Sequence, residues 1–64
     1  MKGKIKWYNI RRGYGFIEGE DGMDVFIHKN EIPFWTIYLN AGDKVEYIIQ
    51  KTKKGLKASQ LKIL

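Results

Sequence analysis

The chain has no cysteine, and it has only one histidine and one serine among its 64 residues. Without cysteine it forms no disulfide and offers no thiolate as a nucleophile or a metal ligand. The lone histidine, His28, has no second histidine and no cysteine with which to complete a zinc site. We therefore expect neither a metal nor a cofactor.

A long hydrophobic run is also missing, since no apolar stretch approaches the ~20 residues that a membrane span requires. The first residues, Met1-Lys2-Gly3-Lys4, lead straight into a strand-like segment and lack the hydrophobic core of a signal peptide. The absence of cysteine also suits a reducing compartment. On these grounds we expect a cytoplasmic protein with no membrane partner.

Groups that could carry out catalysis are equally scarce. Ser59 and His28 are the only serine and histidine, and nothing in the sequence places them together beside an orienting carboxylate. Glu18, Glu20 and Asp21 fall in one polar turn, which is an ordinary place for carboxylates. We expect no catalytic residues and no enzyme.

Positive charge, in contrast, is plentiful. The chain carries 12 Lys and Arg against 7 Asp and Glu, which gives a net charge of +5. Its isoelectric point of about 9.6 lies above the value of about 9 that is typical of nucleic-acid binders. A basic surface can also serve solubility alone, so the charge by itself leaves both interpretations open.

The segments 12–17 and 24–28 are rich in β-branched and aromatic residues, and the turn signal Asp21-Gly22 lies between them. This pattern predicts a β-hairpin. Asp24, at the start of the second segment, could bond a base edge or tie the turn, and both roles stay open.

Alternation along the hairpin sorts its side chains onto two faces. One face is aliphatic and is assigned to the core: Ile17, Val25 and Ile27. The other face carries Tyr14, Phe16, Phe26 and His28. So short a chain cannot cover both sides of a sheet, and aromatic side chains bind unpaired bases with roughly 1–3 kcal/mol each. The aromatic face therefore predicts a site for flat, stackable groups such as nucleobases.

The strand-like segments add up to a small barrel. Alternating residues predict further strands over 2–9, 43–50 and 56–64. The segment 29–42 is irregular, with one helical turn that Pro33 would end. Several short strands joined by turns imply a closed or nearly closed barrel, because closure removes unpaired edges. We expect one monomeric domain, over 1–64.

This pattern does not settle whether the two tryptophans lie in the core or at the binding site. Strict alternation would place Trp7 beside Ile5, on the core side of the first strand. Trp35 follows Pro33 in the irregular segment, and we assign it to binding, with Phe34 as the second choice. Two aliphatic residues of that segment are assigned to the core: Ile32 and Leu39.

Several motifs of the chain resemble the cold-shock domain family. The run 12–16 matches an RNA-recognition signature, K/R-G-F/Y-G/A-F. The RNA-recognition motif also carries that signature, but it is longer than this chain and has two helices. The likeness to the cold-shock domain covers nearly the whole chain and rests on Gly3–Asn9, Gly13–Ile17, Asp24–His28, Leu39, Gly42 and Val45.

This resemblance implies an all-β fold, a barrel of the OB type with five antiparallel strands. It also implies binding of single-stranded RNA or DNA, RNA-chaperone activity and little sequence preference. Carried over by position, the residues that would contact the strand are Lys6, Trp7, Tyr14, Phe16, Phe26 and His28. The family pattern places Trp7 on the outer face, against strict alternation, and we adopt that placement. We add Arg12, Lys29 and Trp35 to the predicted site.

The chain departs from the family pattern at two points. After the second motif the family often has an aromatic residue, where this chain has Lys29. This exchange would remove one stacking platform and add a phosphate contact. The segment 29–42 is also shorter than the common bacterial form, and Trp35 is the candidate for its usual aromatic residue.

One rival function is a small barrel that clasps proline-rich peptides, which also presents aromatic residues on one face. The grooves of such modules usually add acidic residues. Here the aromatic face is flanked by basic residues: Lys4, Lys6, Arg11, Arg12 and Lys29. This composition favours a nucleic acid over a peptide.

Overall fold

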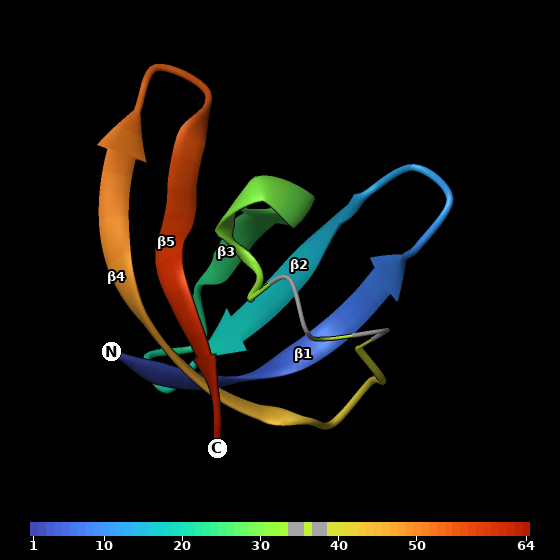
Figure 1. Cartoon of the computed structure of the whole chain (residues 1–64). Helices are drawn as coiled ribbons and strands as arrows, with labels where there is room; N and C mark the ends of the chain where they lie inside the picture. The colour runs from blue at the N-terminus through green and yellow to red at the C-terminus, as the bar shows by residue number, and fades with distance from the viewer. Residues whose placement is uncertain (34–35, 37–38) are drawn as a thin grey trace.

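The computed structural model describes residues 1–33, 36 and 39–64, and shows a barrel of five strands (Figure 1). Its elements are β1 (Lys2–Asn9), β2 (Tyr14–Gly19), β3 (Asp24–His28), the 3-10 helix η1 (Lys29–Glu31), β4 (Lys44–Thr52) and β5 (Gly55–Ile63). The strands are ordered β1-β2-β3-β5-β4 around a closed ring. The all-β class, the hairpin and the closed barrel expected from the sequence are confirmed.

The strand directions correct one detail of that expectation. Four of the neighbouring pairs are antiparallel, but β3 and β5 run parallel and meet where Phe26 pairs with Lys57. The reason is geometric, because strand direction cannot alternate all the way round a closed ring with an odd number of strands. The parallel pair brings the middle of β5 beside the aromatic residues of β3.

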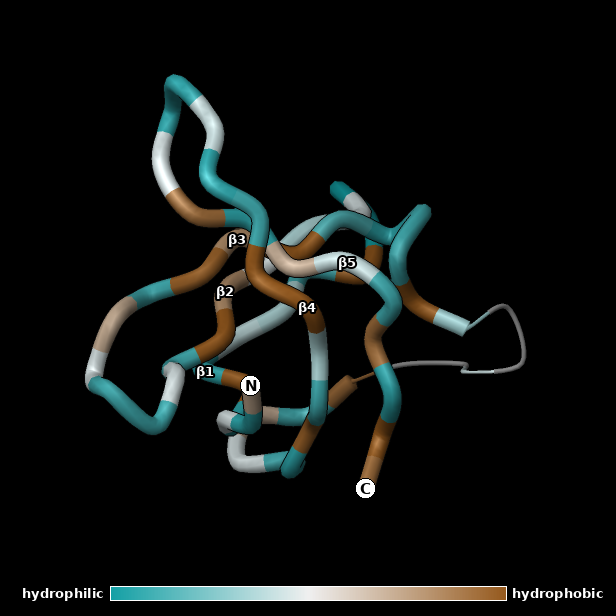
Figure 2. Tube along the Cα trace, turned by 90° about the vertical axis from the view of Figure 1, so that its left-hand side faces the viewer, coloured by the Kyte–Doolittle hydropathy of each residue, from teal (hydrophilic) through white to brown (hydrophobic). Residues whose placement is uncertain are grey.

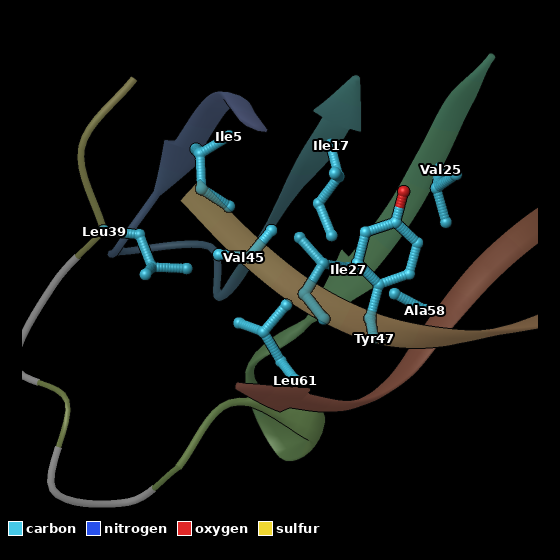
Figure 3. Packing of buried hydrophobic residues seen from close by; sticks show 9 residues of the cluster. All are labelled: Ile5, Ile17, Val25, Ile27, Leu39, Val45, Tyr47, Ala58 and Leu61. Atoms are coloured by element: carbon cyan, nitrogen blue, oxygen red, sulfur yellow. The ribbon is translucent and has the colours of Figure 1, made fainter. Parts of the chain in front are cut away.

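The core fills the inside of this ring. Ile17, Val25 and Ile27 are fully buried, as their alternation predicts. Figure 3 shows them packed with side chains from the other three strands and with Leu39, which precedes β4; the strand residues are Ile5, Val45, Tyr47, Ala58 and Leu61. Ile32 is partly buried against this cluster, so the aliphatic residues assigned to the core lie there.

Hydrophilic residues gather away from this core. Figure 2 shows that the tip of the β4–β5 hairpin is hydrophilic. The Thr52 hydroxyl fixes this tip, since it donates a hydrogen bond to the carbonyl of Gly55 at 2.8 Å and accepts one from the amide of Lys54 at 3.2 Å. The hairpin therefore ends in an ordered basic turn.

A bulge in β1 decides which way Trp7 points. Ile5 pairs with Ile17, and Trp7 pairs with the adjacent residue of the antiparallel strand β2, Phe16. No residue of β2 is left to pair with Lys6, which is therefore the extra residue of β1. The extra residue resets the alternation. Ile5 is therefore buried, with 2% exposed, whereas Trp7 lies on the outside with 43% exposed. The outward placement of Trp7 is confirmed.

A second bulge lies in β5. Two residues of β5 between Ser59 and Lys62 face a single residue of β4 between Glu46 and Ile48. Gln60 takes up the extra length with a positive φ of 53°. Its amide donates a hydrogen bond to Glu31 Oε1 at 3.1 Å, which ties η1 to β5.

Tyr47 brings a hydroxyl into the core. Its side chain is 2% exposed, and its oxygen has no hydrogen-bond partner among residues 1–33, 36 and 39–64. Burial, together with the negative charges of Asp21 and Glu20, raises the pKa of Tyr47. The folded barrel therefore favours the neutral phenol more strongly than the unfolded chain does.

Replacing Tyr47 by phenylalanine should make the domain less sensitive to alkali. A raised folded-state pKa means that this stabilisation is fully present below the unfolded tyrosine value of about 10 and is lost as the pH rises through the folded-state pKa. In urea titrations at about pH 8 and about pH 11, the wild type should lose more stability than Tyr47→Phe. Tyr8→Phe is the control with a smaller expected change, because burial alone raises the pKa of Tyr8. Equal losses in the wild type and Tyr47→Phe would contradict the assignment.

Candidate nucleic-acid interface

Five aromatic side chains form a continuous cluster on the outside of β1, β2 and β3, which we call the aromatic face: Trp7, Tyr14, Phe16, Phe26 and His28. Strand register brings them together, because Phe16 pairs with Phe26 and Tyr14 pairs with His28. Four neighbouring pairs of ring centroids lie 5.5–5.9 Å apart. His28 extends the row beyond Phe26, at 6.4 Å.

The rings touch without stacking flat on one another. Their planes meet at angles between 34° and 74°, and the side chains are half-buried or exposed. Two of the contacts are edge-to-face and three are tilted, and such contacts leave ring faces free for other flat groups. A nucleobase could therefore stack on the aromatic face without displacing any of its rings.

Gly15 allows β1 and β2 to approach closely at the centre of this face. A Cβ atom at this position would collide with the carbonyl oxygen of Trp7 and would lie 2.7 Å from the Cα of Tyr8. Only glycine fits there without moving the strands apart. The aromatic face thus depends on a residue that carries no side chain, because Gly15 sets the distance between Trp7 and Phe16.

The predicted cations border the aromatic face. Arg12 Nη1 lies 3.5 Å from the Tyr14 hydroxyl. Lys29 is exposed at the start of η1, and its amide donates to the carbonyl of Gly13 at 2.8 Å. Lys6, the extra residue of the β1 bulge, is half exposed. These positions would allow Lys6, Arg12 and Lys29 to meet phosphates while the rings meet bases.

Asp24 has a partner that the sequence did not suggest. Its carboxylate pairs with Lys6, at 3.1 and 3.3 Å from the lysine Nζ. The role of tying the turn belongs instead to Asp21, whose Oδ1 accepts a hydrogen bond from the amide of Met23 at 3.0 Å. Both members of the Lys6–Asp24 pair are about half exposed, so the pair contributes little stability and a phosphate could replace the carboxylate beside Lys6.

The site extends onto β5, none of whose residues was predicted to belong to it. A cavity of about 500 Å³ lies between the aromatic face and the β4–β5 hairpin, with Lys54, Leu56 and Lys57 on the hairpin side. A second cavity of about 300 Å³ follows beyond Phe26, and Lys57 borders both. In the sequence, the basic turn over 51–55 was the only sign of this extension. The contact between β3 and β5 depends on how the barrel closes, which no local pattern reveals.

Some predictions lie outside the part of the chain that the structure describes. Trp35 and the alternative Phe34 lie outside the described residues, so their assignment to binding stays a prediction. Within the described ranges, no group of three or more His, Cys, Asp or Glu could hold a metal ion. No helix in those ranges has the length and apolar character needed to cross a membrane.

Comparisons with known proteins show the family of the chain. The sequence profile of the "Cold-shock" DNA-binding domain matches residues 1–64. A cold shock-like protein of Thermotoga maritima is 43% identical over 67 residues, which cover 100% of this chain and 98% of that protein. The major cold shock protein CspA of Pseudomonas aeruginosa is 35% identical over 65 residues, covering 100% of this chain and 94% of that protein.

A solved structure described as "drosophila Unr CSD456" superposes with a TM-score of 0.74. The match covers 98% of this chain and 26% of that one, at 24% identity, so the likeness concerns the fold. The profile and the curated relatives show the family directly. The chain belongs to the cold-shock DNA-binding domain family, and the resemblance noted in its motifs is confirmed.

Proposed function

We propose that this domain binds single-stranded RNA or DNA by stacking unpaired bases on the aromatic face. The contact of five rings on the outside of β1, β2 and β3 carries this proposal. Every base has a flat face, so stacking tolerates most sequences. Lys6, Arg12 and Lys29 contact the phosphates, and their positive charge adds an affinity that falls with salt.

An RNA-chaperone role follows from binding of this kind. A protein that binds only unpaired strands shifts the folding equilibrium of an RNA towards its open forms by mass action. Low sequence preference lets the domain act on many misfolded structures. The aromatic face lies within one chain, so a monomer is sufficient for this function. The family description as a DNA-binding domain supports a nucleic-acid partner.

Adding a pyrimidine-rich oligonucleotide of about 6–8 residues, a length within the site size of one OB fold, should quench the fluorescence of Trp7 saturably. The stacked base would sit against an indole that is 43% exposed. A hairpin or duplex of the same composition should bind far more weakly at moderate salt, because paired bases hide their flat faces. Trp35→Phe removes the other tryptophan and isolates the Trp7 signal.

Two results would count against the proposal in different ways. Equal affinity for the duplex and the single strand would exclude stacking as the mechanism and leave only phosphate contacts. Clear binding without a change in Trp7 emission would keep the single-strand function but would remove Trp7 from the contact surface.

A further inference from the structure

The cavity of about 300 Å³ beyond Phe26 differs in chemistry from the rest of the aromatic face. Phe26 forms an aromatic wall, and the other lining residues are polar or small: His28, Asn30, Glu31, Lys57 and Ala58. The cavity combines one flat apolar wall with several hydrogen-bonding groups. That is the composition of a pocket that reads the edge of a stacked base.

His28 offers this cavity a hydrogen-bond donor. Its Nδ1 accepts a hydrogen bond from the amide of Asn30 at 3.2 Å. Nδ1 is therefore the acceptor nitrogen, and the neutral imidazole carries its proton on Nε2. Lys57 supplies further donors through its ammonium group. Two side chains thus provide donors for an acceptor atom of the ligand.

Glu31 supplies the opposite chemistry. Its Oε1 accepts a hydrogen bond from the amide of Gln60, the residue with positive φ in the β5 bulge. This bond fixes the carboxylate between η1 and β5. Its other oxygen has no hydrogen bond or ion pair to any residue that the structure describes. A held carboxylate can accept two parallel hydrogen bonds from a ligand, and Oε1 can share its second lone pair.

The negative charge of Glu31 also determines which part of a nucleic acid suits the cavity. A carboxylate repels phosphate, so a base edge is the suitable occupant. Guanine is the standard base whose Watson–Crick edge has two adjacent donors, N1–H and the 2-amino group, beside the acceptor O6. Adenine, cytosine, uracil and thymine each place at least one acceptor where guanine has a donor.

We propose that this cavity is a guanine-selective subsite at the end of the aromatic face. Phe26 stacks on the base, Glu31 accepts from N1–H and the 2-amino group, and His28 with Lys57 donates to O6. The inference rests on the proposed binding of single strands and adds one selective position to a surface that otherwise tolerates any base. Glu31 is the residue that determines this preference.

The test compares oligothymidylate of about seven residues with the same strand carrying one central guanine. For the wild type we expect the guanine to raise affinity roughly tenfold or more, in line with one bidentate base contact. Glu31→Gln keeps a side-chain oxygen for the Gln60 amide but places an amino group where the second acceptor was. The ratio of the two affinities should fall towards one in this variant.

Glu20→Gln is the matched control, since it makes the same change in charge in the exposed β2–β3 turn and should keep the guanine preference. Probes test the contact without any mutation of the protein. Inosine lacks the 2-amino group and should lose most of the gain, whereas 7-deazaguanine keeps the Watson–Crick edge and should retain it. The oligonucleotides with inosine and 7-deazaguanine test the contact to the Watson–Crick edge even if Glu31→Gln unfolds.

Oligothymidylate binding separates the two levels of inference. No binding of that strand by the wild type would overturn the proposed function itself. Binding of oligothymidylate without a gain from guanine, or a gain that persists in folded Glu31→Gln, would overturn the guanine subsite alone.

Discussion

Replacing Ile17 by alanine should lower the free energy of unfolding by about 2–5 kcal/mol, the usual cost of removing a large aliphatic side chain from a packed core. Ile17 is fully buried and belongs to the hydrophobic cluster inside the barrel (Figure 3). A domain of this size has little stability to spare. The variant should therefore be largely unfolded or should melt at a much lower temperature.

Urea titration followed by circular dichroism measures this effect. The informative control is Phe16→Ala, one position away on the opposite face of β2, where Phe16 is only partly buried. Its loss of stability should be clearly smaller. A stable Ile17→Ala protein beside an unfolded Phe16→Ala protein would mean that the two faces of the hairpin have been assigned the wrong way round.

This contrast shows what the sequence could establish. Alternation along 14–17 and 25–28 separates core from aromatic residues because the period of a strand is two and the hairpin register follows from its turn. The same reasoning fails at Trp7. The extra residue Lys6 shifts the alternation by one, and a bulge of this kind leaves no pattern in the sequence. Only the family resemblance indicated the correct side.

The β5 part of the site could not be predicted for a different reason. Lys57 reaches the aromatic face through the parallel pair that closes the barrel, and Glu31 is oriented by Gln60, which is 29 residues away in sequence. Neither contact leaves a local pattern. The pairing of Lys6 with Asp24 is similar, because it crosses from β1 to β3 over the strand between them.

Such long-range contacts also bear on how the surface works. Asp24 holds the Lys6 ammonium at one end of the site, and Glu31 places a carboxylate at the other. Both acidic groups lie on a surface that is otherwise basic. Each carboxylate weakens the attraction of phosphate at its own position. In the proposed interface a phosphate replaces Asp24 beside Lys6, whereas Glu31, held by the Gln60 amide, stays in place to accept hydrogen bonds from the edge of a base.

Phe16→Ala and Phe26→Ala should each weaken the binding of a single strand by about 1–3 kcal/mol, the cost of losing one base-stacking platform. The two residues are directly paired across β2 and β3, and their ring centroids lie 5.8 Å apart. Rings in contact support one another, so the loss in the double variant should differ from the sum of the single losses. The expected combined effect is the largest on binding of any change considered for this surface.

Anisotropy of a labelled oligothymidylate gives the affinities, and a melting curve for each variant allows correction to the folded fraction. Ile48→Ala is the matched control, because Ile48 is an exposed apolar residue, 50% exposed, on β4 and outside the aromatic face. It should leave the affinity unchanged. If the two phenylalanine variants bind as tightly per folded molecule as Ile48→Ala does, the strand does not pass over the aromatic face, and the basic residues alone attract it.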